Sequence, residues 1–160
     1  MAARSSPGLP VLHYAVKEIT LAASILAPKT SNIVLGTGGS DGLAYIDTVV
    51  DKLQDASLVH LACHGQQDLQ NPLESGFCLT DGERLTVSKL MQLKLKNAFF
   101  AFLGACETAK GDSTHSDQAI HLAAAMMFVG FRSVIATMWQ VVCVHVSRRC
   151  ETHKCGITGP

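Results

Sequence analysis

The sequence predicts an α/β domain with a mostly parallel central sheet and helices on both of its faces. Three apolar runs, residues 57–63, 98–103 and 133–138, are typical of strands that are buried on both faces, because half-exposed strands alternate apolar and polar residues. Segments with helical spacing alternate with these runs along the chain. That order favours helices that cross over the sheet between parallel strands in the right-handed sense.

Two helices are predicted from apolar spacing and from clear stop signals. Residues 14–27 place apolar side chains every three or four positions, and Pro28 ends the run. Residues 116–129 have a polar start and an apolar face, and Gly130 follows as a C-terminal cap would. Both segments are expected to pack against the sheet.

Between the first helix and the first long apolar run, the pattern predicts a strand, a turn and another helix. The strand is expected over residues 32–36. A glycine-rich turn follows, in which Ser40 or Asp41 would cap a helix that carries the apolar residues of segment 43–53. Strand and helix therefore alternate from the start of the domain.

A hairpin and a short helix are predicted between the first two long strands. Residues 75–86 contain the pair Asp81-Gly82, which is a strong signal for a tight turn, and a small hairpin is predicted there. Thr86 or Ser88 would then begin a short helix that extends to Leu93.

Composition excludes several classes of function. The chain has 13 basic and 13 acidic residues and no basic run, so we expect no nucleic-acid partner. No apolar run approaches the roughly 18 residues that span a bilayer, and residues 1–10 lack the pattern of a secretory signal. We therefore expect a cytoplasmic protein without a membrane partner, with a flexible N-terminus over residues 1–10 and reduced cysteines.

The chemistry is expected where two strands end. His64 follows the run 57–63, and Cys106 follows the run 98–103. In open α/β sheets the functional crevice lies at the carboxyl ends of the strands, and neighbouring strands are only about 5 Å apart. The two side chains are therefore expected to converge on one edge of the sheet.

A histidine and a cysteine in this arrangement form a workable nucleophile with its acid/base partner. The thiolate is the reactive form of cysteine, and an imidazole beside it can lower the thiol pKa or protonate a leaving amine. The backbone amides of Gly65 and Cys106 are candidates for holding an oxyanion. This chemistry needs neither a metal nor a cofactor. On spacing alone the structural alternative stays open, since such residues are often a satisfied core histidine and a small buried hydrophobe.

Four stretches resemble the successive signatures of one known family, the CHAT domain, and they occur in its order. Residues 12–19 also resemble its opening helix, and residues 121–125 and 130–132 resemble the helix and turn before its last motif. The resemblance covers residues 11–141, which we take as the domain. The four stretches are HLACHG at 60–65, NPLESG at 71–76, GACETA at 104–109 and SVIATMW at 133–139.

CHAT domains are relatives of caspases and separases, so the resemblance implies a caspase-like three-layer sandwich and a cysteine endopeptidase. It makes His64 the general acid/base and Cys106 the nucleophile. Candidates for the substrate pocket are Glu107, Asp117 and Trp139. The implied partners are a protein or peptide substrate and repeat domains of the TPR type. The competing hypothesis is a protease-like interaction module that has lost catalysis.

The sequence departs from the family pattern near its end. Trp139 is followed by residues 140–143 without a carboxylate, so the acid that would support a preference for a basic substrate residue is missing. Residues 142–160 have no periodicity and no resemblance to the family. We expect this segment to be an atypical, disordered tail and the C-terminal part of the fold to be truncated.

Metal and nucleotide sites are disfavoured by spacing. Within the strand ending at His64, alternation points Cys63 away from His60 and His64, so no shared metal is expected. The glycine-rich stretch 36–40 lacks the Gly-Lys-Ser/Thr of a phosphate loop, and no Gly-x-Ser-x-Gly supports a generic α/β hydrolase. The remaining metal-ligand types fit no zinc module; they are His145, Cys150, His153 and Cys155.

Overall fold

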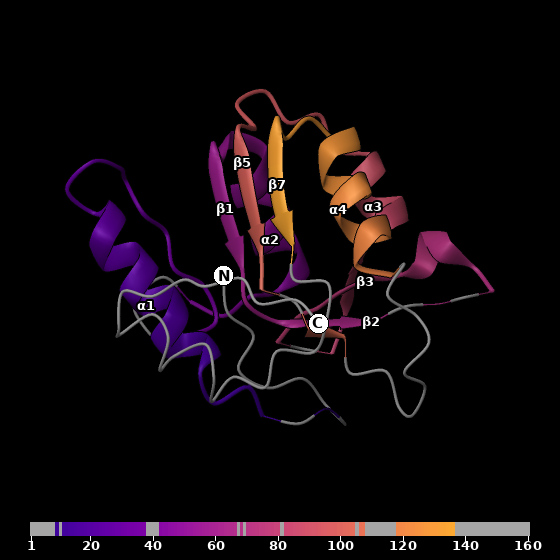
Figure 1. Ribbon diagram of the computed structural model, residues 1–160, viewed down its shortest axis with the longest axis horizontal. Helices are drawn as coiled ribbons and strands as arrows, with labels where there is room; N and C mark the ends of the chain where they lie inside the picture. Colours follow the sequence, from indigo (N-terminus) through magenta and orange to yellow (C-terminus); the bar gives the residue numbers. More distant parts are fainter. Residues whose placement is uncertain are drawn as a thin grey trace, which may run out of the picture.

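The computed structural model shows a mixed α/β protein with two sheets (Figure 1). The residues that it describes are 9, 11–37, 42–66, 68, 70–80, 82–104, 106–107 and 118–136, with the side chains of 106–107 and 118–121 left aside. One sheet has three strands and the other has four.

The three-stranded sheet is parallel throughout, as the apolar runs predicted. Its strands are β1 (Leu58–Leu61), β5 (Phe100–Leu103) and β7 (Ser133–Ala136), in the order β1-β5-β7. They run side by side in one direction in Figure 1. The sequence order 1-5-7 across the sheet requires crossover connections, because parallel neighbours cannot be joined by a tight turn.

One face of this sheet is covered by α2 (Ile46–Asp55) and α4 (Gln118–Phe128), and α3 (Val87–Met91) packs against α4. In Figure 1, α2 lies behind the strands, and α4 lies beside β7 with α3 next to it. Alternate strand residues pack with these helices into one apolar core. The core includes Val49 and Leu53 of α2, Leu90 of α3, Met126 of α4, and Leu61, Ala101 and Leu103 of the strands.

The opposite face of the sheet is more open, which corrects the prediction of strands buried on both faces. Leu58 and Ile135 are 41% and 53% exposed, whereas Ala101 and Leu103 on the covered face are at most 2% exposed. Helix α1 (Ala15–Leu26) approaches this side, but a cavity of about 1180 Å³ lies between it and β1. The strands are therefore apolar in near-continuous runs although one of their faces is only partly covered.

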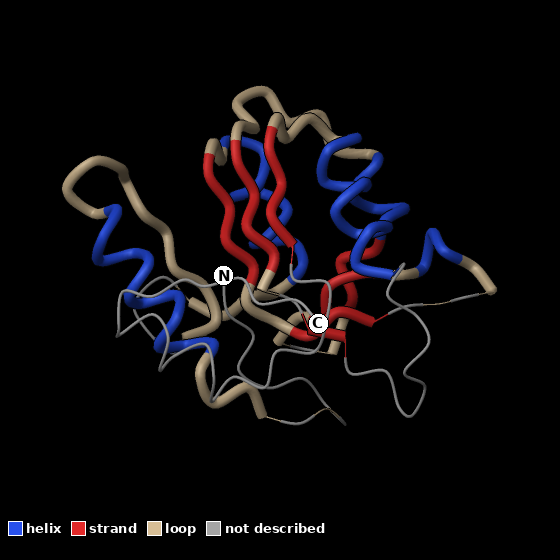
Figure 2. Tube along the Cα trace, viewed as in Figure 1, coloured by secondary structure: helices blue, strands red, loops and turns tan. Residues whose placement is uncertain are grey.

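The second sheet has the order β4-β3-β2-β6, and it lies below the parallel sheet in the view of Figure 2. The predicted hairpin is confirmed in β3 (Gly76–Cys78) and β4 (Arg84–Thr86), which pair antiparallel. Its turn is closed by the Leu79 amide donating to the Glu83 carbonyl at 2.9 Å, with Gly82 at a φ of 84°. Only glycine adopts this backbone region readily. The 3₁₀ turn η1 (Pro72–Glu74) precedes the hairpin.

The chain continues from each of two parallel strands into the second sheet. The chain leaves β1, bends at Ala62 and Cys63, and resumes as β2 (His64–Gln66). Likewise β5 is followed after two residues by β6 (Cys106–Glu107). The strand predicted over residues 57–63 is thus shorter than expected, and His64 and Cys106 each begin a new strand.

Two predictions about the region before β1 were wrong. Residues 32–36 form no strand, and instead the Gly36 amide closes a loop by donating to the Gly42 carbonyl at 2.9 Å. Helix α2 begins at Ile46, with Tyr45 at its N-cap, and not after Ser40 or Asp41, which lie outside the described residues. The Ala44 carbonyl instead accepts from the Thr80 amide at 3.3 Å, a tertiary bond just before the helix.

The other helix signals are confirmed. Helix α1 matches the predicted segment 14–27. Helix α4 ends as expected, since Gly130 has a φ of 121° and the Phe131 amide bonds back to the Met126 carbonyl at 3.2 Å. Thr86 caps α3 by accepting from the Lys89 amide. Across the described part of the chain, no helix is long and apolar enough to cross a membrane.

Candidate active site

The structure places His64 and Cys106 directly opposite one another on neighbouring parallel strands. β2 pairs with β6, and the register sets His64 against Cys106 and Gly65 against Glu107. The same offset along the chain holds in β1 and β5, where Leu61 lies opposite Leu103. The register therefore continues unchanged from one sheet to the next, and it brings a histidine and a cysteine to one register position.

This placement puts the two backbones about 5 Å apart, the usual spacing of neighbouring strands. The sequence predicted that the two side chains would meet at the carboxyl ends of the strands of the parallel sheet. In the structure the pairing occurs one step further, in the second sheet, where β2 is flanked by β3 on one side and β6 on the other. The histidine strand therefore has hydrogen-bonded neighbours on both edges.

His64 lies inside the protein. Its relative exposure is 1%, and it is among the largest fully buried side chains of the described residues. Gly65 is also buried. A position enclosed in this way restricts the imidazole to few rotamers, which suits a group that must keep a fixed relation to a reacting atom.

The other predicted site residues are only partly placed. Glu107 ends β6, opposite Gly65. The oxyanion role of the Gly65 and Cys106 amides stays a prediction. Asp117 and Trp139 lie outside the described residues. The same is true of the tail 142–160 and of its candidate metal ligands.

Two other cysteines lie near the site and are chemically different from a nucleophile. Burial raises the pKa of the Cys63 thiol to about 12, and Cys63 is completely enclosed in the core. Burial also raises the pKa of Cys78, while the charge of Arg84 acts in the opposite direction. Both thiols are therefore protonated at neutral pH, and a protonated thiol is a poor nucleophile.

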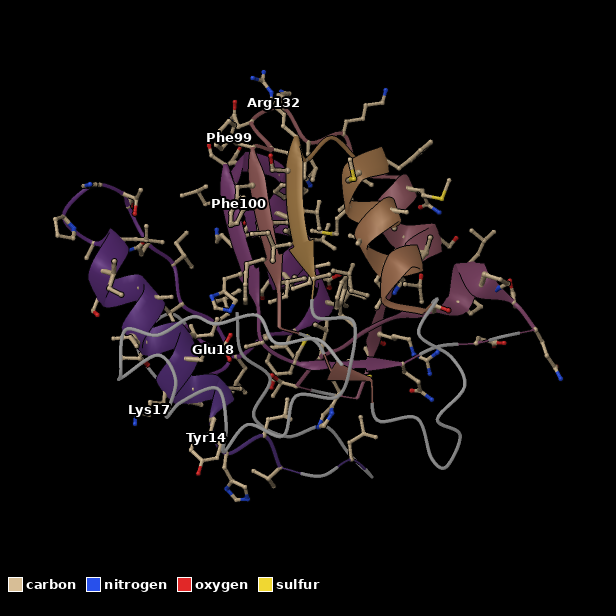
Figure 3. The ribbon with its side chains drawn as sticks, in the orientation of Figure 1. Tyr14, Lys17, Glu18, Phe99, Phe100 and Arg132 are labelled. Atoms are coloured by element: carbon tan, nitrogen blue, oxygen red, sulfur yellow. The ribbon has the colours of Figure 1, made fainter. Side chains whose placement is uncertain are left out.

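The structure adds a polar contact that the sequence did not reveal. Glu18 of α1 lies 2.7 Å from the His60 ring, joining Oε1 to Nε2. Figure 3 shows Glu18 on the side of α1 that faces the sheet. The His60 ring also packs edge-on against Phe102, with ring centroids 4.7 Å apart. The contact links α1 to the strand that leads to His64.

Glu18 also lies against Gly104, two residues before Cys106. A methyl group at Gly104 would come within 3.0 Å of Glu18 Oε1. The charge and helical spacing of residue 18 could have been read from the sequence, but its partners on β1 and β5 lie too far along the chain to be inferred. Glu18 is therefore a candidate for positioning both strands that deliver the site residues.

The structure does not assemble a metal site in its described part. No group of three or more His, Cys, Asp or Glu side chains converges there. Cys63 belongs to the main core, whereas His60 contacts Glu18 on the α1 side of the sheet. The three potential metal ligands of the HLACHG motif, His60, Cys63 and His64, thus do not share one site.

Comparison with known families decides the lineage. A family model described as the CHAT domain matches residues 3–144, most of the chain. The chain belongs to the CHAT domain family. The resemblance inferred from the four sequence motifs is confirmed, and membership makes this a caspase-like, protease-related domain. A comparison with curated proteins gave no match.

Proposed function

We propose that this CHAT domain is a caspase-like cysteine endopeptidase that uses His64 and Cys106 as a catalytic dyad. The observation that carries the proposal is the register of β2 and β6, which sets the two residues opposite one another. Residues paired in this way on neighbouring strands share one face of a sheet. The proposal includes a caspase-like three-layer fold, a cytoplasmic location, a protein or peptide substrate and repeat-domain partners of the TPR type.

The expected reaction has two steps. His64 accepts the proton of the Cys106 thiol, and the sulfur attacks the carbonyl carbon of the scissile peptide. The backbone amides of Gly65 and Cys106 are the candidate donors to the resulting oxyanion. The C–N bond then breaks, and His64 returns the proton to the leaving amine. Water, deprotonated by the same histidine, hydrolyses the thioester and regenerates the thiol.

The alternative is a protease-like interaction module without catalysis. The low exposure of His64 favours this alternative, because a substrate must reach the imidazole. The two functions make opposite predictions for the reactivity of Cys106. An activated thiolate reacts at neutral pH, whereas an inert buried thiol does not.

The test combines thiol labelling with peptide cleavage on the purified full chain. We expect iodoacetamide at neutral pH to label Cys106, and mass spectrometry to locate the label. Cys63 and Cys78 serve as internal controls, because their raised pKa values predict slow reaction in the folded protein. In a peptide library we expect cleavage that is lost in Cys106→Ala. Replacing His64 with alanine should lower kcat/KM by roughly 10²–10⁴-fold, the usual contribution of general acid–base catalysis.

The interaction-module alternative predicts a different pattern. Cys106 would then label no faster than Cys63, no peptide would be cut, and capture of protein partners would be unchanged by Cys106→Ala. Labelling of Cys106 that does not depend on His64, together with an absence of cleavage, would count against the dyad.

A further inference from the structure

An arginine on the outer strand of the second sheet reaches across to the histidine strand. Arg84 of β4 donates from Nη2 to Oε1 of Gln66 on β2 at 2.7 Å. It also donates from Nη1 to the Glu74 carbonyl at 2.9 Å. Strand β3 lies between β4 and β2, so the guanidinium spans a whole strand. Two bonds to separate segments hold it in place.

The sheet register shows on which face this guanidinium lies. Phe77 and Leu85 are paired in register, and both belong to the buried core. Alternate residues of a strand point to opposite faces, so Cys78 and Arg84, the next pair in register, lie on the face away from that core. The Cys78 sulfur lies 4.0 Å from Gln66 Oε1, in agreement with this assignment.

His64 lies on the same face of the sheet as Gln66 and Arg84. Gly65 pairs with the core residue Phe77, so its two neighbours, His64 and Gln66, lie on the other face. Two residues along a strand separate positions by roughly 7 Å. The Arg84–Gln66 pair is therefore about that distance along β2 from the position where His64 faces Cys106.

The charge of Arg84 affects a neighbouring side chain on this face. It lowers the pKa of the neighbouring Cys78 thiol, against the larger effect of burial. Gln66 is exposed and Arg84 is partly exposed, so both can be reached from solvent. The nearest acidic neighbour along the strand, Glu83, lies 3.9 Å from the Lys89 ammonium. A fixed and accessible positive charge thus lies beside the proposed dyad.

We propose that Arg84 and Gln66 form a specificity site that binds an acidic side chain of the substrate, within a few residues of the cut. A guanidinium has five N–H donors in a planar fork that matches a carboxylate, and the two bonds above use two of them. Because Gln66 Oε1 accepts from Arg84, the amide nitrogen of Gln66 can donate to the same carboxylate. This inference rests on the proposed peptidase function and adds its substrate class.

The first experiment measures cleavage of matched peptides by the full chain. One glutamate is moved through each position that flanks the cut, and each peptide is compared with its glutamine counterpart. We expect one position where glutamate raises kcat/KM roughly three- to tenfold, the range for a charge-assisted contact that is partly exposed. Arg84→Gln should bring the ratio of kcat/KM for the glutamate and glutamine peptides close to one, and Arg84→Glu should favour lysine there. Lys52→Gln, which changes the net charge equally on α2, is the matched control.

The preference for glutamate would be overturned if it were absent in the wild type, or if it survived Arg84→Gln. Thermal unfolding checks that the Arg84 variants fold. If Arg84→Gln does not fold, Gln66→Ala replaces it, and a smaller loss of the same preference is expected. Preference unchanged in Gln66→Ala would then contradict the site.

A second experiment separates this inference from the peptidase activity. Binding of fluorescent glutamate and glutamine peptides to Cys106→Ala is measured by polarisation at low and high salt. If the wild type cleaves nothing, the peptidase proposal fails, but tighter binding of the glutamate peptide that depends on Arg84 and weakens in salt still supports the site. Equal binding of the two peptides overturns it.

Discussion

The two sheets of this CHAT domain differ in how their faces are covered. In the parallel sheet one face is packed by helices in the main core, while the other carries exposed apolar residues such as Ile135. In the second sheet, residues on both faces of β3 are buried, with Phe77 on the core face and Cys78 on the other. The small sheet that carries His64 is therefore the more completely enclosed of the two.

The difference suggests that the parallel sheet holds the helices together, whereas the second sheet fixes the position of His64. The parallel sheet joins the helices through one face and can leave the other partly open. The second sheet has few residues, so its strands keep their register only because packing on both sides fixes them. Substitutions in the second sheet should accordingly cost more stability than substitutions on the open face.

The largest effect is expected from Phe77→Ala. Phe77 has no exposed surface, and its removal should lower the free energy of unfolding by about 3–5 kcal/mol, the usual cost of an aromatic-to-alanine change in a core. The control, Ile135→Ala on the open face, should cost less than about 1 kcal/mol because Ile135 is half exposed. Urea unfolding monitored by circular dichroism measures both. Similar losses for the two variants would erase the contrast between the sheets.

The next effect concerns the bend between β1 and β2, where Cys63 lies in the core. Its folded pKa of about 12 exceeds its ordinary value of 9.0, so the folded state holds the proton more tightly. The resulting stabilisation is complete below pH 9 and is lost as the pH rises toward 12. At about 1.4 kcal/mol per pH unit, the loss reaches about 3 kcal/mol by pH 11.

Cys63→Ala provides the comparison for this alkaline loss. The free energy of unfolding of the wild type should fall more steeply between pH 9 and 11 than that of Cys63→Ala, measured by urea titration at each pH. Parallel curves would show that the Cys63 thiol has the same pKa in the folded and unfolded protein, and that Cys63 is therefore not enclosed.

Two glycines sharpen the comparison at a smaller scale. A methyl group at Gly76 in the second sheet would lie 2.4 Å from the Leu85 carbonyl oxygen, which is backbone and cannot move alone. Gly76→Ala should therefore cost about 1–3 kcal/mol. At Gly104 the nearest atom is the flexible Glu18 carboxylate at 3.0 Å, so Gly104→Ala should cost less. Thermal melts of the two variants decide the order, and a larger loss at Gly104 would reverse it.

The smallest effect is expected at the contact that joins α1 to the open side. Glu18 and His60 are 38% and 22% exposed, and such pairs contribute about 0.2–1 kcal/mol. Glu18→Gln keeps the shape and should lower stability by no more than this amount. If Glu18 also positions the strands that lead to the dyad, the variant should reduce kcat at unchanged KM. A change in stability with no change in kcat would assign Glu18 a purely structural role.

Much of the fold could be read from the sequence because the signals are local. Helical spacing with a proline or glycine stop identified α1 and α4, and an Asp-Gly turn identified the β3–β4 hairpin. Runs of apolar residues identified the three parallel strands. The motifs identified the CHAT family, and with it the histidine and the cysteine worth following.

Other features were decided by contacts between residues far apart in the chain. Helix α2 begins only at Ile46, after the tertiary bond between the Ala44 carbonyl and the Thr80 amide, and residues 32–36 are not a strand. The pairing of β1 with β5 continues in the same register as the pairing of β2 with β6, which sets His64 opposite Cys106. Periodicity reports the environment of each segment alone. Which segments meet is determined only in the folded chain. That choice sets the register of the strands, leaves one sheet face open and forms the hydrogen bond from Arg84 to Gln66.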